Sequence, residues 1–228
     1  MNQSKNELVG AEPRRIFVVE DHPITRLGLV ELINDEPDMR VCGEADGSAD
    51  TVKLIHSLKP DLVLLDITLP GKSGLVLIKE IQAWLPNALI LAISMHDEDL
   101  YAERVLRAGG HGYVMKSAGR EMILHAMRQV MQGETFVSEH VSKCIVDTFA
   151  GRRPESVTAS LGRLSDREFE VFQLIGQGLP TAEIGQRLFV SPKTIDSHRL
   201  HIMDKLNLHS LPELMRYAVR WAATEEMI

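Results

Sequence analysis

Residues 62–66 have the sequence LVLLD, four consecutive apolar residues followed by an acid. A run of this kind is typical of a short strand that is buried on both faces. Two other stretches have the same character, IFVV at 16–19 and LILAI at 89–93. Such strands occur in parallel sheets, because helices cover both faces of a parallel sheet.

On either side of residues 62–66, apolar runs alternate with stretches of helical spacing. We expect strands at 16–19, 40–44, 62–65, 89–93 and 112–115, and helices at 23–34, 49–58, 73–84, 100–108 and 120–132. Strands that alternate with helices predict βαβ units, a parallel sheet and right-handed crossovers. Residues 14–133 are therefore predicted to form one doubly wound α/β domain.

Polar side chains follow four of the five predicted strands. Glu20 and Asp21 follow the first strand, Asp66 the third, Ser94 the fourth and Lys116 the fifth. The carboxyl ends of parallel strands meet at one edge of a sheet, so we expect these side chains to lie together. Clustered carboxylates need a cation, and hard oxygen ligands favour Mg²⁺ or Mn²⁺. A carboxylate can also carry a phosphoryl group, whose oxygens a metal, a lysine and a hydroxyl would stabilise.

The last part of the chain, residues 163–228, is predicted to be an all-α domain of four short helices. Ser165 and Glu168 form a capping-box pattern before an apolar run, and Ser191-Pro192 is a strong helix start. Helices are expected after Ser165, at 181–188, from 192 to about 205, and at 211–223. The second and third, with the turn at 189–191, make a helix-turn-helix over about 180–206.

Composition and the remaining segments narrow the class of protein. The chain has 228 residues, a net charge of −7 and two distant cysteines, Cys42 and Cys144. No apolar run reaches the length of a membrane span, and the cysteines lack the spacing of a disulfide scaffold or a thiolate zinc site. We expect a cytoplasmic protein with no membrane partner. An N-terminal arm at 1–13 and a linker at 134–162, helical over 134–150 and flexible beyond, complete the organisation.

Four motifs resemble the receiver domain of two-component response regulators. They are VVEDHP at 18–23, LVLLDITLPGKSG at 62–74, LAIS at 91–94 and GYVMKS at 112–117. The resemblance implies a flavodoxin-like (βα)5 fold and a phosphoryl group received from a sensor histidine kinase with Mg²⁺ as cofactor. One departure is Glu20, where most members of the family have aspartate.

The resemblance also implies a role for individual residues. Asp66 would be the phosphoacceptor, with Asp21 binding the metal directly and Glu20 through water. Asp66 and the backbone carbonyl of Thr68 would complete the protein ligands of the metal. Side chains that would act on the phosphoryl group or report its presence are Ser94, Lys116 and the switch aromatic Tyr113.

Residues 164–208 resemble the LuxR-type DNA-binding domain. A receiver followed by this domain is the layout of the NarL/FixJ class of response regulators. The 100° step of a helix places Ile195, Ile202 and Leu206 on the inner face of the third helix. Candidates for contact with DNA bases or phosphates are Lys193, Thr194, Asp196, Ser197, Leu200, His201 and Lys205.

The expected function is transcription regulation. Phosphorylation of Asp66 would control homodimer formation and binding to an imperfect two-fold promoter site, with RNA polymerase as a further candidate partner. One alternative keeps DNA binding and makes the receiver a phosphorylation-independent dimerisation or ligand-sensing module. Another is a turnover enzyme, a phosphatase of the haloacid dehalogenase class. It is disfavoured because Asp66-Ile67-Thr68 lacks the second acid of the DxDxT motif and follows the third strand.

Overall fold

The computed structural model describes residues 12–69, 73–150 and 160–225. Most of the expected N-terminal arm, part of the motif at 62–74 and most of the flexible connection lie outside the described residues. The chain divides into two compact units. The first comprises residues up to 95 together with 105–138, and the second comprises 96–104 together with residues from 139 onward.

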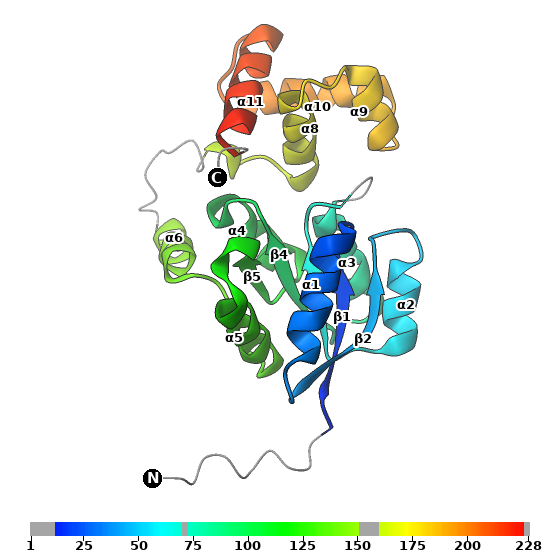
Figure 1. Cartoon of the computed structure of the whole chain (residues 1–228). Helices are drawn as coiled ribbons and strands as arrows, with labels where there is room; N and C mark the ends of the chain where they lie inside the picture. The colour runs from blue at the N-terminus through cyan, green and yellow to red at the C-terminus, as the bar shows by residue number, and fades with distance from the viewer. Residues whose placement is uncertain (1–11, 70–72, 151–159, 226–228) are drawn as a thin grey trace. The chain divides into compact units, whose positions relative to one another are not determined.

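A parallel five-stranded sheet forms the centre of the first unit, with strand order β2-β1-β3-β4-β5 (Figure 1). This order is flavodoxin-like, so the predicted fold is confirmed. The strands are β1 (Arg14–Val19), β2 (Met39–Ala45), β3 (Leu62–Asp66), β4 (Leu89–Ser94) and β5 (Gly112–Met115). The helices are α1 (Pro23–Asn34), α2 (Thr51–Leu58), α3 (Gly74–Trp84), α4 (Glu98–Ala108), which spans both units, and α5 (Arg120–Met131).

Both faces of the sheet are buried, as the apolar runs predict. Ile16 and Val18 of β1 join the core formed with α1 and α5. Phe17 and Val19, which alternate with them, are also fully buried. Because consecutive side chains of a strand point to opposite faces, only a continuous apolar run can satisfy two covered faces.

The strand register brings the polar ends of the strands to one edge. Asp66, the last residue of β3, lies beside Ile93 of β4, one residue before Ser94. Ser94 in turn pairs with Met115, the residue before Lys116. The apolar pairing along the sheet therefore sets the positions of the acceptor, the hydroxyl and the ammonium.

Residues 134–138 differ from prediction. The expected helix over 134–150 begins only at Glu139, as α6 (Glu139–Phe149). Gly133, with a φ of 86°, ends α5, and Phe136 then forms an isolated parallel bridge with Gly112 of β5. The Tyr113 amide donates to the Phe136 carbonyl at 2.8 Å. This pairing replaces the predicted first turns of the helix.

Helices form the second unit beyond α6, and the all-α prediction is confirmed. They are α8 (Asp166–Gly176), α9 (Thr181–Arg187), α10 (Pro192–Lys205) and α11 (Leu211–Glu225). Both hydrogen bonds of the predicted capping box between Ser165 and Glu168 are present. Phe169, Phe172, Ile195 and Ile202 are buried among these helices. Among the described helices of both units, none has the length and apolar character needed to cross a membrane.

Gly74 sits where α3 starts against the loop that follows Asp66. A Cβ atom at this position would lie 2.4 Å from the Ile67 Cα and 2.7 Å from the Asp66 carbonyl oxygen. These neighbours are backbone atoms, which cannot rotate away as a side chain can. Glycine is therefore required for the close approach of α3 to the acceptor loop.

We predict that Gly74→Ala lowers the stability of the protein by about 1–3 kcal/mol, the usual cost of forcing extra atoms into a packed site. Thermal unfolding of the full chain measures this change. Gly28→Ala in α1 is the matched control, since no atom of the described residues lies within 4 Å of its added Cβ. The control should be slightly stabilising, because alanine favours the helix by about 0.5–1 kcal/mol over glycine. Equal unfolding midpoints for the two variants would contradict the packing argument.

Candidate functional site

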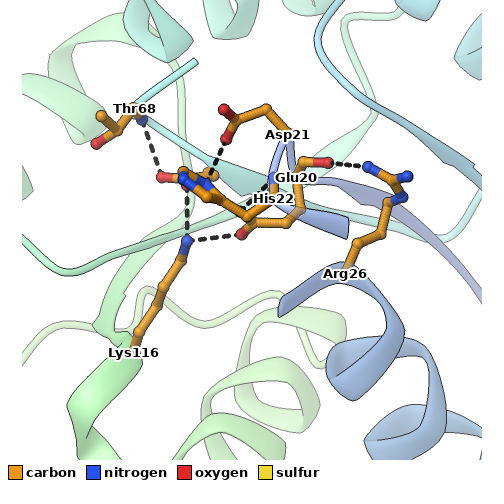
Figure 2. A network of polar contacts seen from close by, with 7 residues as sticks. Glu20, Asp21, His22, Arg26, Thr68 and Lys116 are labelled. Atoms are coloured by element: carbon orange, nitrogen blue, oxygen red, sulfur yellow. Dashed lines mark hydrogen bonds and ion pairs between the residues drawn. The ribbon is translucent and has the colours of Figure 1, made fainter. Parts of the chain in front are cut away.

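An ammonium lies between two buried carboxylates at the carboxyl edge of the sheet (Figure 2). The Lys116 Nζ is 2.7 Å from the Asp66 Oδ2 and 2.6 Å from the Glu20 Oε2. Asp66 is 2% exposed and Glu20 is fully buried. Three of the sequence-predicted residues, far apart along the chain, therefore meet in one contact.

The Asp66 carboxylate is held from both sides. Its second oxygen, Oδ1, accepts a hydrogen bond of 2.9 Å from the Thr68 backbone amide. Burial raises the pKa of Asp66 above its usual value, and the hydrogen bonds from Lys116 and Thr68 oppose that rise. For Lys116, burial alone would lower the pKa, but the hydrogen bonds to Asp66 and Glu20 outweigh it and the pKa is raised. The lysine is therefore charged at neutral pH.

The acidic loop after β1 is organised by two residues that the sequence reasoning missed. The His22 backbone amide donates to the Glu20 Oε1 at 3.2 Å, and its ring Nδ1 lies 3.0 Å from the Asp21 Oδ1. Arg26 donates to the Glu20 backbone carbonyl at 2.7 Å (Figure 2). Arg26 lies one turn into α1. The predicted start of that helix was therefore the sequence signal that could have placed Arg26 near Glu20.

The donor set suits a divalent cation with hard oxygen ligands. Glu20, Asp21 and Asp66 bring three carboxylates together, and Lys116 supplies one compensating charge among the contacts of this site. Glu20 Oε2 is buried, and its contact among the described residues is with the Lys116 ammonium. Such a surplus of buried carboxylate oxygen is the environment that Mg²⁺ or Mn²⁺ stabilises.

Two further predicted residues lie on the neighbouring strands. Ser94, at the end of β4, is fully buried, and Tyr113 of β5 is 1% exposed. Ser94 is one residue beyond the β4 partner of Asp66. Tyr113 pairs with Ala92, two residues before Ser94. The serine is thus at the edge where the carboxylates lie, and the tyrosine is inside the sheet region next to it.

The second candidate surface is the outer side of α10. Its exposed members are Lys193, Asp196, Ser197, Leu200, His201 and Asp204. Leu200 is 62% exposed, which is unusual for a leucine and leaves its methyl groups available. Ile195 and Ile202 are fully buried, as the helical periodicity predicts.

Contacts within the second unit restrain two of the proposed DNA-contact residues. The Lys205 Nζ lies 2.6 Å from the Glu168 Oε2, so its charge is paired with the capping residue of α8. Thr194 donates its backbone amide to the Ser191 Oγ at 3.1 Å, as part of the cap that starts α10. Arg199, absent from the sequence-based set, donates to the Thr181 hydroxyl and links α9 to α10.

Comparison with known proteins shows the family of this chain. Residues 16–128 match the response regulator receiver domain, and residues 162–218 match the bacterial regulatory proteins of the luxR family. The chain belongs to the two-component response regulators of the NarL/FixJ class, which bind DNA and regulate transcription.

Individual relatives agree with this assignment over nearly their full length. The chain is similar to the oxygen regulatory protein NreC of Staphylococcus carnosus, with 35% identity covering 90% of this chain and 97% of the relative. It is also similar to the structure of RcsB from Salmonella enterica serovar Typhimurium bound to promoter rprA. That match has a TM-score of 0.69 and 25% identity, and covers 91% of this chain and 99% of RcsB. A LuxR-family response regulator from Aurantimonas has 32% identity, a TM-score of 0.57, and coverage of 61% and 99%.

We predict that Asp66→Asn stabilises the metal-free protein at neutral pH by about 1 kcal/mol, because it removes a buried charge. The folded-state pKa of Asp66 is raised, so its ionisation costs stability. This cost in stability is absent when the pH is below the ordinary pKa of 3.8. It grows as the pH rises from that value through the folded-state pKa. The advantage of the variant should therefore be larger at pH 7 than at pH 4. Urea unfolding in a chelator measures it, with exposed Glu31→Gln as control.

Proposed function

We propose that Asp66 receives one phosphoryl group from a sensor histidine kinase and that this modification controls DNA binding. The observation that carries the proposal is the Lys116 ammonium in contact with both Asp66 and Glu20. An Asp66 carboxylate oxygen attacks phosphorus while the bond from phosphorus to the donor histidine nitrogen breaks. The product is a single acyl phosphate on each chain, so the protein is not a turnover enzyme.

The neighbouring residues have defined tasks in this step. Glu20, Asp21, Asp66 and the Thr68 backbone carbonyl would hold Mg²⁺, which neutralises phosphoryl oxygens when bound. Lys116 keeps its charge and pairs with a phosphoryl oxygen in place of the Asp66 oxygen that has reacted. Ser94 donates a hydrogen bond to another oxygen.

The phosphoryl group then shifts a conformational equilibrium. Tyr113 acts as the switch aromatic on β5, and its buried ring lies on the strand next to Ser94. A group bound at Asp66 shifts the population only by its preference for one state over the other. The state that it favours forms the homodimer.

DNA binding follows from the helix-turn-helix. Helix α10 enters the major groove, where Ser197 and Leu200 reach base edges and a thymine methyl group. Lys193 and Thr194 contact phosphates near the start of the helix, and Lys205 does so only if it leaves Glu168. Flanking residues of the same surface are Asp196 and His201. The homodimer binds an imperfect two-fold promoter site in the cytoplasm, with RNA polymerase as a further partner.

These roles correspond to proposed segments of the chain. The receiver spans residues 14–133, after an arm at 1–13. A linker at 134–162 leads to the DNA-binding domain at 163–228, with its helix-turn-helix over about 180–206.

Intact-protein mass spectrometry tests the phosphorylation. The full chain is incubated with Mg²⁺ and a small phosphodonor such as acetyl phosphate, beside Asp66→Asn and the control Asp61→Asn. We expect one added phosphoryl group, removed by mild base, on wild type and on the control only. Sizing before and after the reaction should show conversion to a dimer.

The phosphatase alternative predicts continuous release of phosphate instead of one stable adduct. An adduct on neither wild type nor control would contradict the proposal. That result would favour the phosphorylation-independent regulator, in which the receiver is a dimerisation or ligand-sensing module.

We predict that Leu200→Ala lowers affinity for a specific site by roughly five-fold, the loss of about 1 kcal/mol of methyl contact. Binding to unrelated DNA should be unchanged. Lys193→Ala should instead weaken binding to all sequences and reduce the salt slope by about 0.9 for each half-site. Fluorescence anisotropy on both DNAs over a salt series measures these changes.

Leu54→Ala, which removes a leucine that is 43% exposed on α2, is the matched control for Leu200→Ala. Its affinity for both DNAs should equal that of wild type. A proportional loss on specific and unrelated DNA for Leu200→Ala would contradict a base contact by this side chain.

A further inference from the structure

Helices α4 and α6 bring a mixed set of metal-binding side chains together within the second unit. Asp99 comes from α4, and His140 and Cys144 come from successive turns of α6. The donor atoms of the three side chains all lie within 4.8 Å of one another. Sequence spacing did not indicate this site, because Asp99 is 41 residues from His140.

The distances between donor atoms centre on the His140 ring. Its Nε2 lies 3.0 Å from the Asp99 Oδ1 and 3.2 Å from the Oδ2. The Cys144 Sγ lies 3.8 Å from the same Nε2. One imidazole nitrogen thus faces a carboxylate and a sulfur at once.

These separations match the edges of a tetrahedral zinc site. Zinc–nitrogen, –oxygen and –sulfur bonds near 2.0–2.3 Å at tetrahedral angles require donor atoms about 3.4–3.6 Å apart. The Asp99 Oδ1 lies slightly closer to the imidazole nitrogen than this, and the Cys144 Sγ lies slightly farther from it. Each of these two separations is within about half an ångström of the tetrahedral value.

The Asp99 carboxylate supplies a second observation. Its Oδ1 is buried, lies 3.0 Å from the His140 Nε2 and has no hydrogen-bond partner among the described residues, whereas Oδ2 makes a hydrogen-bond contact with the same Nε2. A neutral imidazole with its lone pair toward this oxygen would be repelled, so the contact requires a proton or a metal cation between the two atoms. The adjacent thiol favours the metal, since a sulfur, an imidazole nitrogen and a carboxylate together are the ligand types that bind a transition metal.

Glu103 is a further carboxylate near these side chains. It is one turn from Asp99 on α4 and lines the same small pocket, together with Asp99, Val141, Cys144 and Ile145. Each helix therefore contributes a pair of residues spaced by four, which share one helix face.

We propose that Asp99, His140 and Cys144, with Glu103 or water in the fourth position, form a binding site for Zn²⁺ or a similar divalent transition metal. Sulfur and imidazole ligands select such metals, whereas the all-oxygen set around Asp66 suits Mg²⁺. The two sites therefore take different ions. A metal bound here ties α4 to α6 and stabilises the arrangement of these two helices.

Cobalt substitution tests the site in the full chain. Co²⁺ is added in the presence of excess Mg²⁺, and the ultraviolet and visible spectrum is recorded. We expect a thiolate-to-cobalt charge-transfer band and the strong visible absorption of four-coordinate cobalt, with one Co²⁺ per chain. Zn²⁺ should displace the cobalt and raise the unfolding temperature.

Matched variants separate this site from every other. Cys144→Ser should lose the charge-transfer band, and His140→Gln should weaken Co²⁺ binding at least ten-fold. Cys42→Ser, which removes the other cysteine, from β2, should leave the spectrum unchanged. Glu20→Gln, at the carboxylate site around Asp66, should also leave the spectrum unchanged.

A charge-transfer band that persists in Cys144→Ser would overturn the proposal, as would the absence of cobalt binding to wild type. Circular dichroism of each variant shows whether it is folded. If Cys144→Ser is unfolded, the His140→Gln titration decides the question, because unchanged cobalt affinity in that variant contradicts the site.

Discussion

The geometry of the candidate site in the first unit depends on one ammonium that lies between two buried carboxylates. Glu20 and Asp66 are almost free of solvent, and the Lys116 ammonium lies against both carboxylates. The contact requires β1, β3 and β5 to end at one edge, in a fixed register. Apolar side chains on both faces of the sheet supply that register, so the hydrophobic core is also what positions the chemistry.

Much of this was predictable because the relevant signals are local. A continuous apolar run identifies each strand, and the residue after it identifies the site edge, as with Asp66 after residues 62–65. The pairing of Phe136 with Gly112 was not predictable, because the helical spacing over 134–150 has no local sign that its first residues prefer another strand. The ion pair of Lys205 with Glu168 depends likewise on how α8 and α10 pack.

The two proposed metal sites differ in their ligands for a reason rooted in secondary structure. Strand ends offer short acidic loops, which converge as oxygen ligands at the edge of a sheet. Facing helices offer residues spaced by four, which allow histidine and cysteine to share one ion. Helix α4 contributes residues to both units. Asp99 lies in the part of this helix that belongs to the second unit, and Ala108 lies in the part that belongs to the first.

The pairing of Lys205 has a consequence for the search along the genome. On the outer side of α10, Lys193 is the exposed lysine or arginine of that helix, and Asp196 lies beside it. In the proposed DNA complex, α10 would therefore attract arbitrary phosphates only weakly, and it would retain little of the protein on unrelated DNA. Competition from the many non-specific sites of a chromosome falls accordingly. Promoter occupancy then follows the concentration of the active dimer quickly, because few molecules are held in reserve along the chromosome.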